Sequence, residues 1–150
     1  MFKVLVPYSP IDVEVEILRR THHGFDAHDL ASAGLTAVIT SEQVADVRKL
    51  AQQVTVEDGI LKYIADINAA SRRSPDLVLG ASARAATHVL LASKTFAALQ
   101  GRDLVTPDDV KFIVPPVFRH RILLKPEAEI EGLNADAVIQ RLLGNVEVPR

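Results

Sequence analysis

Residues 82–110 read SARAATHVLLASKTFAALQGRDLVTPDDV and contain one complete helix and the start of a second. Apolar residues recur at helical spacing through Ser82–Leu99, and Gly101 follows as a helix terminator. Thr106 then precedes Pro107 and two acidic residues, which is the strongest helix start in the sequence. We therefore expect a helix capped by Ser82, followed by a second helix capped by Thr106.

Helix-start residues also precede four other segments with helical apolar spacing. They are Ser9-Pro10, Thr40 with Gln43, Thr55–Asp58 and Asn134. Proline interrupts helices because it lacks the backbone N–H, so helices are expected to end at Pro75 and at Pro115-Pro116. Many capped helices with few strand signals predict a mainly α protein, an orthogonal α-helical bundle.

Two short segments favour extended structure. Phe2–Val6 is rich in strand-forming residues and stops at Pro7, which predicts a strand too short to stand without a larger sheet. Ile122–Leu124 predicts a second short extended piece, and residues 76–80 predict a linker. The expected organisation is therefore a strand remnant over residues 1–8 and a helical domain over residues 9–150.

Composition narrows the class of protein. The 150 residues suit one ordinary domain, and 17 Lys and Arg against 19 Asp and Glu give a net charge of -2. This balance argues against a nucleic-acid binder, which needs a basic face. There is no cysteine, no apolar run long enough to span a bilayer, and no secretory signal at the start. We expect a cytoplasmic protein with neither nucleic acid nor membrane as partner.

No complete catalytic set is present in the sequence. The phosphate-binding loop GxxxxGK[ST], the dinucleotide motif GxGxxG and the nucleophile motif GxSxG are all missing. His22, His23 and His28 lie close in sequence, but adjacent histidines on a helix project in different directions. No metal site is predicted from them, because a metal needs three or four converging ligands.

Arg84 occupies an unusual place in the first turn of its predicted helix. The helix dipole is positive there, so a cation is disfavoured unless an anion lies nearby. Helix amino termini bind phosphate, and arginine adds a bidentate fork. The alternative is an exposed arginine with no role, and spacing alone favours that alternative.

A family resemblance changes this balance. Gly80–Ala85, Gln100–Val110 and Pro115–Ile122 resemble, in order and at fitting spacings, the C-terminal lid of MoxR-type AAA+ ATPases. Phe2–Tyr8 is similar to the stretch that follows the arginine-finger region in this family, and Val146–Pro149 to the usual chain end. The resemblance covers nearly all of the chain.

The resemblance implies that a larger α/β nucleotide-binding core precedes Met1 in the full protein. Residues 1–8 would be the last strand and hinge of that core, and residues 9–150 would be the lid. Arg84 matches the sensor-2 arginine of the family motif G-A-S-P-R-A, although Ala83 replaces the proline. The resemblance implies that Arg84 is catalytic and contacts the γ-phosphate of ATP, in its own subunit or a neighbouring one, with Ser82 and Tyr8 as further nucleotide contacts.

The family's partners and cofactors follow in the same way. ATP and magnesium would serve the full-length protein, while the isolated chain would bind neither stably and would not hydrolyse ATP. The resemblance further implies a ring, commonly hexameric, a chaperone-like role in maturing protein complexes, and partners with von Willebrand factor A domains. The competing hypothesis is a stand-alone helical module that binds a protein and no nucleotide. A third hypothesis, a DNA binder suggested by the histone-like Val105–Val110, is disfavoured by the net charge.

Overall fold

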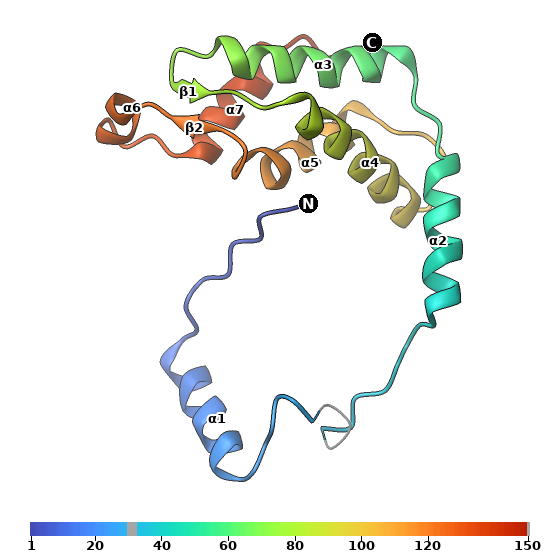
Figure 1. The fold of residues 1–150 in the computed structure, drawn as a ribbon, viewed down its shortest axis with the longest axis vertical. Coiled ribbons are helices and arrows are strands. Elements are labelled where there is room, and N and C mark those ends of the chain that lie inside the picture. The colour runs from blue at the N-terminus through green and yellow to red at the C-terminus, as the bar shows by residue number, and fades with distance from the viewer. Residues whose placement is uncertain (30–32, 150) are drawn as a thin grey trace. The chain divides into compact units, whose positions relative to one another are not determined.

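The computed structural model describes residues 1–29 and 33–149, and its contacts divide the chain into two compact units. The smaller unit, Leu5–Ala45, contains α1 (Ile11–His22). The larger unit combines Met1–Val4 with Asp46–Arg150. It holds most of α2 (Ser41–Gln53), then α3 (Asp58–Arg73), β1 (Leu77–Leu79), α4 (Ala83–Leu99), α5 (Pro107–Phe118), β2 (Leu123–Leu124), α6 (Pro126–Ile130) and α7 (Ala135–Asn145), as Figure 1 shows. The prediction of a mainly α protein is confirmed.

The core of the larger unit lies among α3, α4, α5 and α7, which contact one another. Each helix contributes apolar side chains that are fully buried or nearly so, including Ile67, Val89, Val110 and Ile139. Because this burial involves helices from both ends of the unit, the unit has one continuous apolar core.

A two-stranded antiparallel sheet borders this core, with Leu77 of β1 opposite Leu124 of β2. The expected extended piece at residues 122–124 is therefore confirmed over Leu123–Leu124. Residues 76–80 were expected to be a linker, but they contain β1. The three-residue strand was missed because it is too short to show a periodic pattern and depends on a partner that follows α5.

The connection between α4 and α5 is fixed by a buried carboxylate. Arg102 donates from Nη2 and Nη1 to the two oxygens of Asp109, at 2.6 and 2.8 Å. Thr106 and Asp109 form the reciprocal bonds of a capping box at the start of α5. Burial alone would raise the pKa of Asp109, but the hydrogen bonds from Arg102 and Thr106 outweigh it and hold the pKa below its usual value. The buried carboxylate therefore stays ionised and paired.

Helix starts agree with the sequence in several places and shift in others. Thr106 and Asn134 accept the expected capping bonds, and Thr40 and Gln43 form the expected reciprocal pair. At α1 the expected cap, Ser9, is wrong by one residue: Pro10 holds the N-cap position and the helix begins at Ile11. Pro10 has the φ and ψ of extended backbone, which excludes it from the helix itself.

The expected helix break at Pro115-Pro116 is wrong, because α5 continues to Phe118. Both prolines lie in its last turns. The last four carbonyls of α5 all find donors: those of Pro115 and Phe118 accept from the backbone of Arg119 and Arg121, at 3.1 and 2.7 Å. The side chain of Arg121 donates to the carbonyl of Val117, and the backbone N–H of Lys3 donates to the carbonyl of Pro116. A fully satisfied carboxyl end offsets the helix bonds that proline removes.

Residues 2–6 form no strand among the described residues, although the sequence favours one. Met1–Val4 belongs to the larger unit, in which the N–H of Lys3 donates to the carbonyl of Pro116 at 2.9 Å. A strand needs a neighbouring strand to pair with, and β1 and β2 pair with each other. The division into residues 1–8 and 9–150 stays a prediction, and residue 150 lies outside the described residues.

Asp109→Ala should lower the free energy of unfolding by about 3 kcal/mol, because it removes the acceptor of the Thr106 N–H and leaves Arg102 without its carboxylate. Urea denaturation of the chain measures this change. Asp108→Ala is the matched control, since the neighbouring side chain is 89% exposed and its bond to Lys111 is worth little. Equal losses in the two variants would contradict the role given to Asp109.

Candidate functional site at the start of helix α4

The chain leaves the end of α3, passes through β1 and turns into α4 beside α3 (Figure 1). Arg84 is the second residue of α4 and its side chain is exposed. Within the described residues it makes no hydrogen bond and no ion pair, unlike Arg102 and Arg119, which are bound to carboxylates. Arg84 is therefore free to bind an anion from outside the unit.

Side chains of α3 hold the loop that precedes Arg84. The hydroxyl of Ser71 accepts from the N–H of Ala81 at 2.9 Å, and the Nε of Arg72 donates to the carbonyl of Ala81 at 2.9 Å. With its amide turned to suit its neighbours, Asn68 donates to the carbonyls of Ala81 and Ser82 and accepts from Nη2 of Arg72 at 2.8 Å. Both backbone polar groups of Ala81 are thus bonded to side chains, and Ala81 itself is fully buried.

Gly80 lets this loop lie directly on the backbone of α3. A Cβ on Gly80 would stand 2.6 Å from the Cα and the N of Arg72, closer than real Cβ atoms approach backbone. Because the neighbouring atoms are backbone, they cannot move aside as a flexible side chain could. Glycine is therefore required here for close approach.

A titratable side chain follows Arg84 in the next turn of α4. His88 lies one turn further along α4, and its Nδ1 is buried without a hydrogen-bond partner. Burial lowers the pKa of His88, and the charges of Arg121 and Arg84 lower it further. His88 is therefore neutral near pH 7, so it adds no second positive charge next to Arg84. An anion that approached this end of α4 would meet the helix dipole and Arg84 together.

The structure brings two of the three predicted site residues together. Ser82 and Arg84 lie at the same end of α4. Ser82 takes the N-cap position, but its side chain makes no capping bond, so the expected cap is wrong in that respect. Its hydroxyl, exposed to solvent, has no hydrogen bond among the described residues. Tyr8 is fully exposed and belongs to the smaller unit. Its role in nucleotide binding stays a prediction.

Sequence reasoning missed the residues that hold the loop. Asn68, Ser71 and Arg72 follow the spacing i, i+3, i+4, so they share one side of α3. Asn68 and Ser71 are buried although they are polar. Polar residues on a helix face that otherwise packs into a core indicate specific backbone partners. That pattern, together with the glycine shortly after it, was the available signal.

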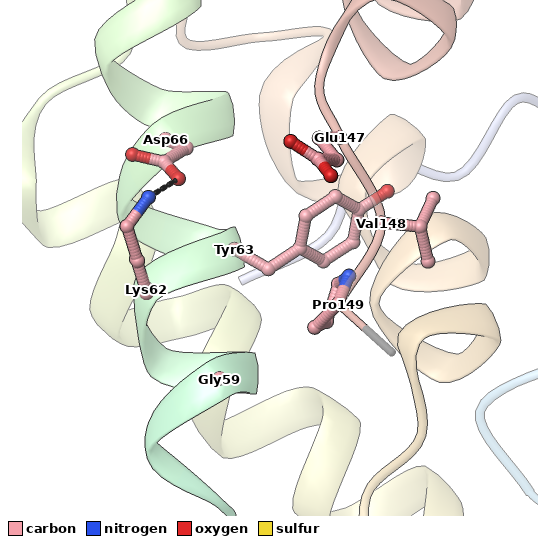
Figure 2. Close-up of a pocket in the computed structure, with 7 residues that line it drawn as sticks. All are labelled: Gly59, Lys62, Tyr63, Asp66, Glu147, Val148 and Pro149. Atoms are coloured by element: carbon pink, nitrogen blue, oxygen red, sulfur yellow. Dashed lines mark hydrogen bonds and ion pairs between the residues drawn. The ribbon is translucent and has the colours of Figure 1, made fainter.

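A pocket lies between α3 and the residues that follow α7. Figure 2 shows the side chains around this pocket of about 260 Å³, with Tyr63 between Lys62 and Asp66 on one side and the segment Glu147–Pro149 on the other. Lys62 is already paired with Asp66. The hydroxyl of Tyr63 is buried without a partner, and burial raises its pKa. This pocket offers less to an anion than the start of α4 does.

The described residues offer neither a cluster of metal ligands nor a membrane-spanning helix. No group of three or more His, Asp or Glu side chains is placed to hold a metal ion. No helix in that part of the chain is long and apolar enough to cross a membrane.

Comparison with known proteins bears directly on the helix that carries Arg84. Residues 69–142 match the AAA lid domain family. The chain is 31% identical over 149 residues to the uncharacterized protein YeaC of Bacillus subtilis, covering 99% of this chain and 45% of that protein. It is 26% identical over 159 residues to the chaperone MoxR1 of Mycobacterium tuberculosis, covering 100% of this chain and 40% of MoxR1.

A solved structure agrees with these sequence matches. The crystal structure of a protein assigned as an ATPase from Cytophaga hutchinsonii superposes with a TM-score of 0.81 at 26% identity. The match covers 100% of this chain and 47% of the other. The chain thus spans less than half the length of the proteins it matches.

His88 makes the stability of the chain depend on pH. Its pKa is lower in the folded state than in the unfolded chain, so acidification protonates the unfolded chain first and favours unfolding. The free energy of unfolding should fall between about pH 7.5 and about pH 5.5, and His88→Gln should make that fall less steep. Urea denaturation at both pH values measures it.

His28→Gln serves as the control, because His28 is exposed in the smaller unit. Part of the fall should remain in His88→Gln, since burial also lowers the pKa of His120. An unchanged slope in His88→Gln would contradict the assignment.

Proposed function

Because the chain belongs to the MoxR-type AAA+ ATPases as their lid domain, we propose that it supplies Arg84 to ATP bound by the ATPase core. The observation that carries the proposal is the exposed, unpaired guanidinium of Arg84 in the first turn of α4. A cation costs free energy at this end of a helix, and an anionic ligand removes that cost.

The chemistry of the site suits a phosphate. Arginine binds phosphate with two parallel hydrogen bonds, and helix amino termini add backbone N–H donors. The hydroxyl of Ser82 lies at the same end of α4 and is free to donate to a phosphate oxygen. Tyr8, fully exposed in the smaller unit, is the further nucleotide contact of this proposal.

In this proposal Arg84 acts on the charge that develops during phosphoryl transfer. ATP with magnesium, when bound by the core, supplies the phosphoryl group. Arg84 places a fixed positive charge against the γ-phosphate, which stabilises the transition state more than the ground state. Because Arg84 belongs to a compact unit, loss of its phosphate contact after hydrolysis would release the lid, and the chemistry would be coupled to a movement.

The activity of the whole protein follows from the family. We infer a cytoplasmic AAA+ ATPase that forms a ring, commonly a hexamer, and matures protein complexes in a chaperone-like way. MoxR1, one of the relatives, is described as a chaperone. Proteins with von Willebrand factor A domains are the partners of this proposal. The match to an AAA lid family favours it over a stand-alone interaction module.

Arg84→Ala in the full-length protein should lower ATP turnover by about 100-fold or more, because one transition-state contact is lost. Steady-state ATPase assays measure this change, and circular dichroism of the isolated chain should show unchanged helix content. Arg48→Ala is a matched control, since Arg48 is an exposed arginine of α2 without a partner in the described part of the chain. Unchanged turnover in Arg84→Ala would remove Arg84 from the mechanism.

The isolated 150-residue chain should not hydrolyse ATP, because its sequence has no phosphate-binding loop to hold the triphosphate. A phosphate-release assay on the purified chain checks this. A sample carrying Arg84→Ala controls for contaminating ATPases, since contamination would give both samples the same rate. Turnover that disappears in Arg84→Ala would show that the chain is itself an ATPase.

A further inference from the structure

Arg72 is the residue of α3 most closely tied to the position of Arg84. It lies in the last turn of α3, and its Nε donates to the carbonyl of Ala81, three residues before Arg84. Its Nη2 donates to Asn68, which in turn bonds the carbonyls of Ala81 and Ser82. The guanidinium is thus held at two points, and both lead to the loop that starts α4.

The same residue also contacts the loop through its backbone. The Cα and N of Arg72 form the surface on which Gly80 lies, with no room for a Cβ between them. The carbonyl that Arg72 bonds therefore belongs to a segment already pressed against its own main chain. Side chain and backbone of Arg72 together leave Ala81 little freedom to move.

The helix that follows does not depend on Arg72 for its core packing. Ala85, Val89 and Ala92 of α4 are buried among the apolar side chains of the unit. The first turn, by contrast, has no side-chain cap, because Ser82 makes no such bond. Loss of Arg72 should therefore leave α4 folded but let its first turn shift.

We propose that Arg72 is a positioning residue for Arg84: its fork fixes the loop Gly80–Ser82, and so sets where the Arg84 guanidinium meets phosphate. The proposal rests on the function proposed for Arg84. Arg72 binds backbone and Asn68 rather than nucleotide, so it acts through Arg84. A displacement of about 1 Å at a catalytic group can cost about 100-fold in rate.

Lysine cannot replace Arg72 in this role. One ammonium group cannot donate to Ala81 and to Asn68 with the planar geometry of the fork. Arg72→Lys keeps the charge and most of the stem, so it tests the fork without removing the cation. Arg73→Ala is the matched control, because Arg73 is the next residue, is exposed, and has no partner among the described residues.

The test measures ATP turnover by the full-length protein. Arg72→Ala and Arg72→Lys should each lower kcat by about tenfold or more while KM for ATP changes by less than about threefold, since the affected contact acts in the transition state. Arg73→Ala should change kcat by less than about twofold. A kcat of Arg72→Lys equal to that of the unaltered protein would overturn the proposal.

A double-mutant cycle separates positioning from a general structural effect. If Arg72 acts through Arg84, adding Arg72→Lys to Arg84→Ala should cause no further loss of kcat. A further loss as large as in the single variant would overturn the proposal, because Arg72 would then act elsewhere. If Arg84→Ala itself leaves turnover unchanged, the proposed function fails. If Arg84→Ala lowers turnover but the Arg72 variants leave kcat unchanged, only the positioning proposal fails.

A readout without ATPase activity completes the test. Amide hydrogen exchange at Ala81 reports the loop directly, because its N–H is bonded to Ser71. Arg72→Lys should accelerate that exchange while the amide of Val89, in the middle of α4, stays protected. Unchanged exchange at Ala81 would show that Arg72 does not hold the loop, and would overturn the proposal.

Discussion

Gly80 rests on the last turn of α3 so closely that main chain touches main chain, and side chains of the same turn bond both polar groups of Ala81. Where α4 begins, and in which direction it leaves, depends on this junction. Because Ala81 and Ser71 are fully buried, loss of these bonds would leave buried polar groups without partners. A loop held this firmly behaves as part of the core, although it is not a regular element.

The charged residues of the larger unit fall into two groups. Asp109 and Arg102 satisfy each other at the turn between α4 and α5, and Arg119 is bound to Asp136 with its side chain only 17% exposed. Arg84 has no such partner within the described residues. Arg102 and Arg119 are therefore neutralised internally, whereas the guanidinium at the start of α4 keeps its charge available for a ligand from outside.

A firmly bonded junction at Gly80–Ser82, followed by the unpaired guanidinium of Arg84, suits the role of a lid domain. An arginine that must meet a phosphate gains nothing from a mobile backbone, because each additional position lowers the fraction of time spent in the productive one. Because α3 fixes Gly80–Ser82 in the folded protein, this loop loses its conformational entropy during folding and not when the nucleotide binds. The residues that hold the loop are then as much a part of the proposed mechanism as Arg84 is.

The sequence alone determined the helical class, most helix starts and the position of Arg84 in a first turn, because caps, prolines and apolar spacing act between neighbours in the chain. Sequence reasoning missed β1, misjudged Pro115-Pro116, and did not identify Ser71 and Arg72 as the residues that hold Ala81. Each of these depends on atoms that lie apart until the chain folds: β1 needs β2, the end of α5 needs Lys3, and Ala81 needs the last turn of α3. Tertiary structure alone decided which arginines are paired and that Arg84 is left without a partner among the described residues, because pairing depends on distances in space that spacing along the chain does not fix.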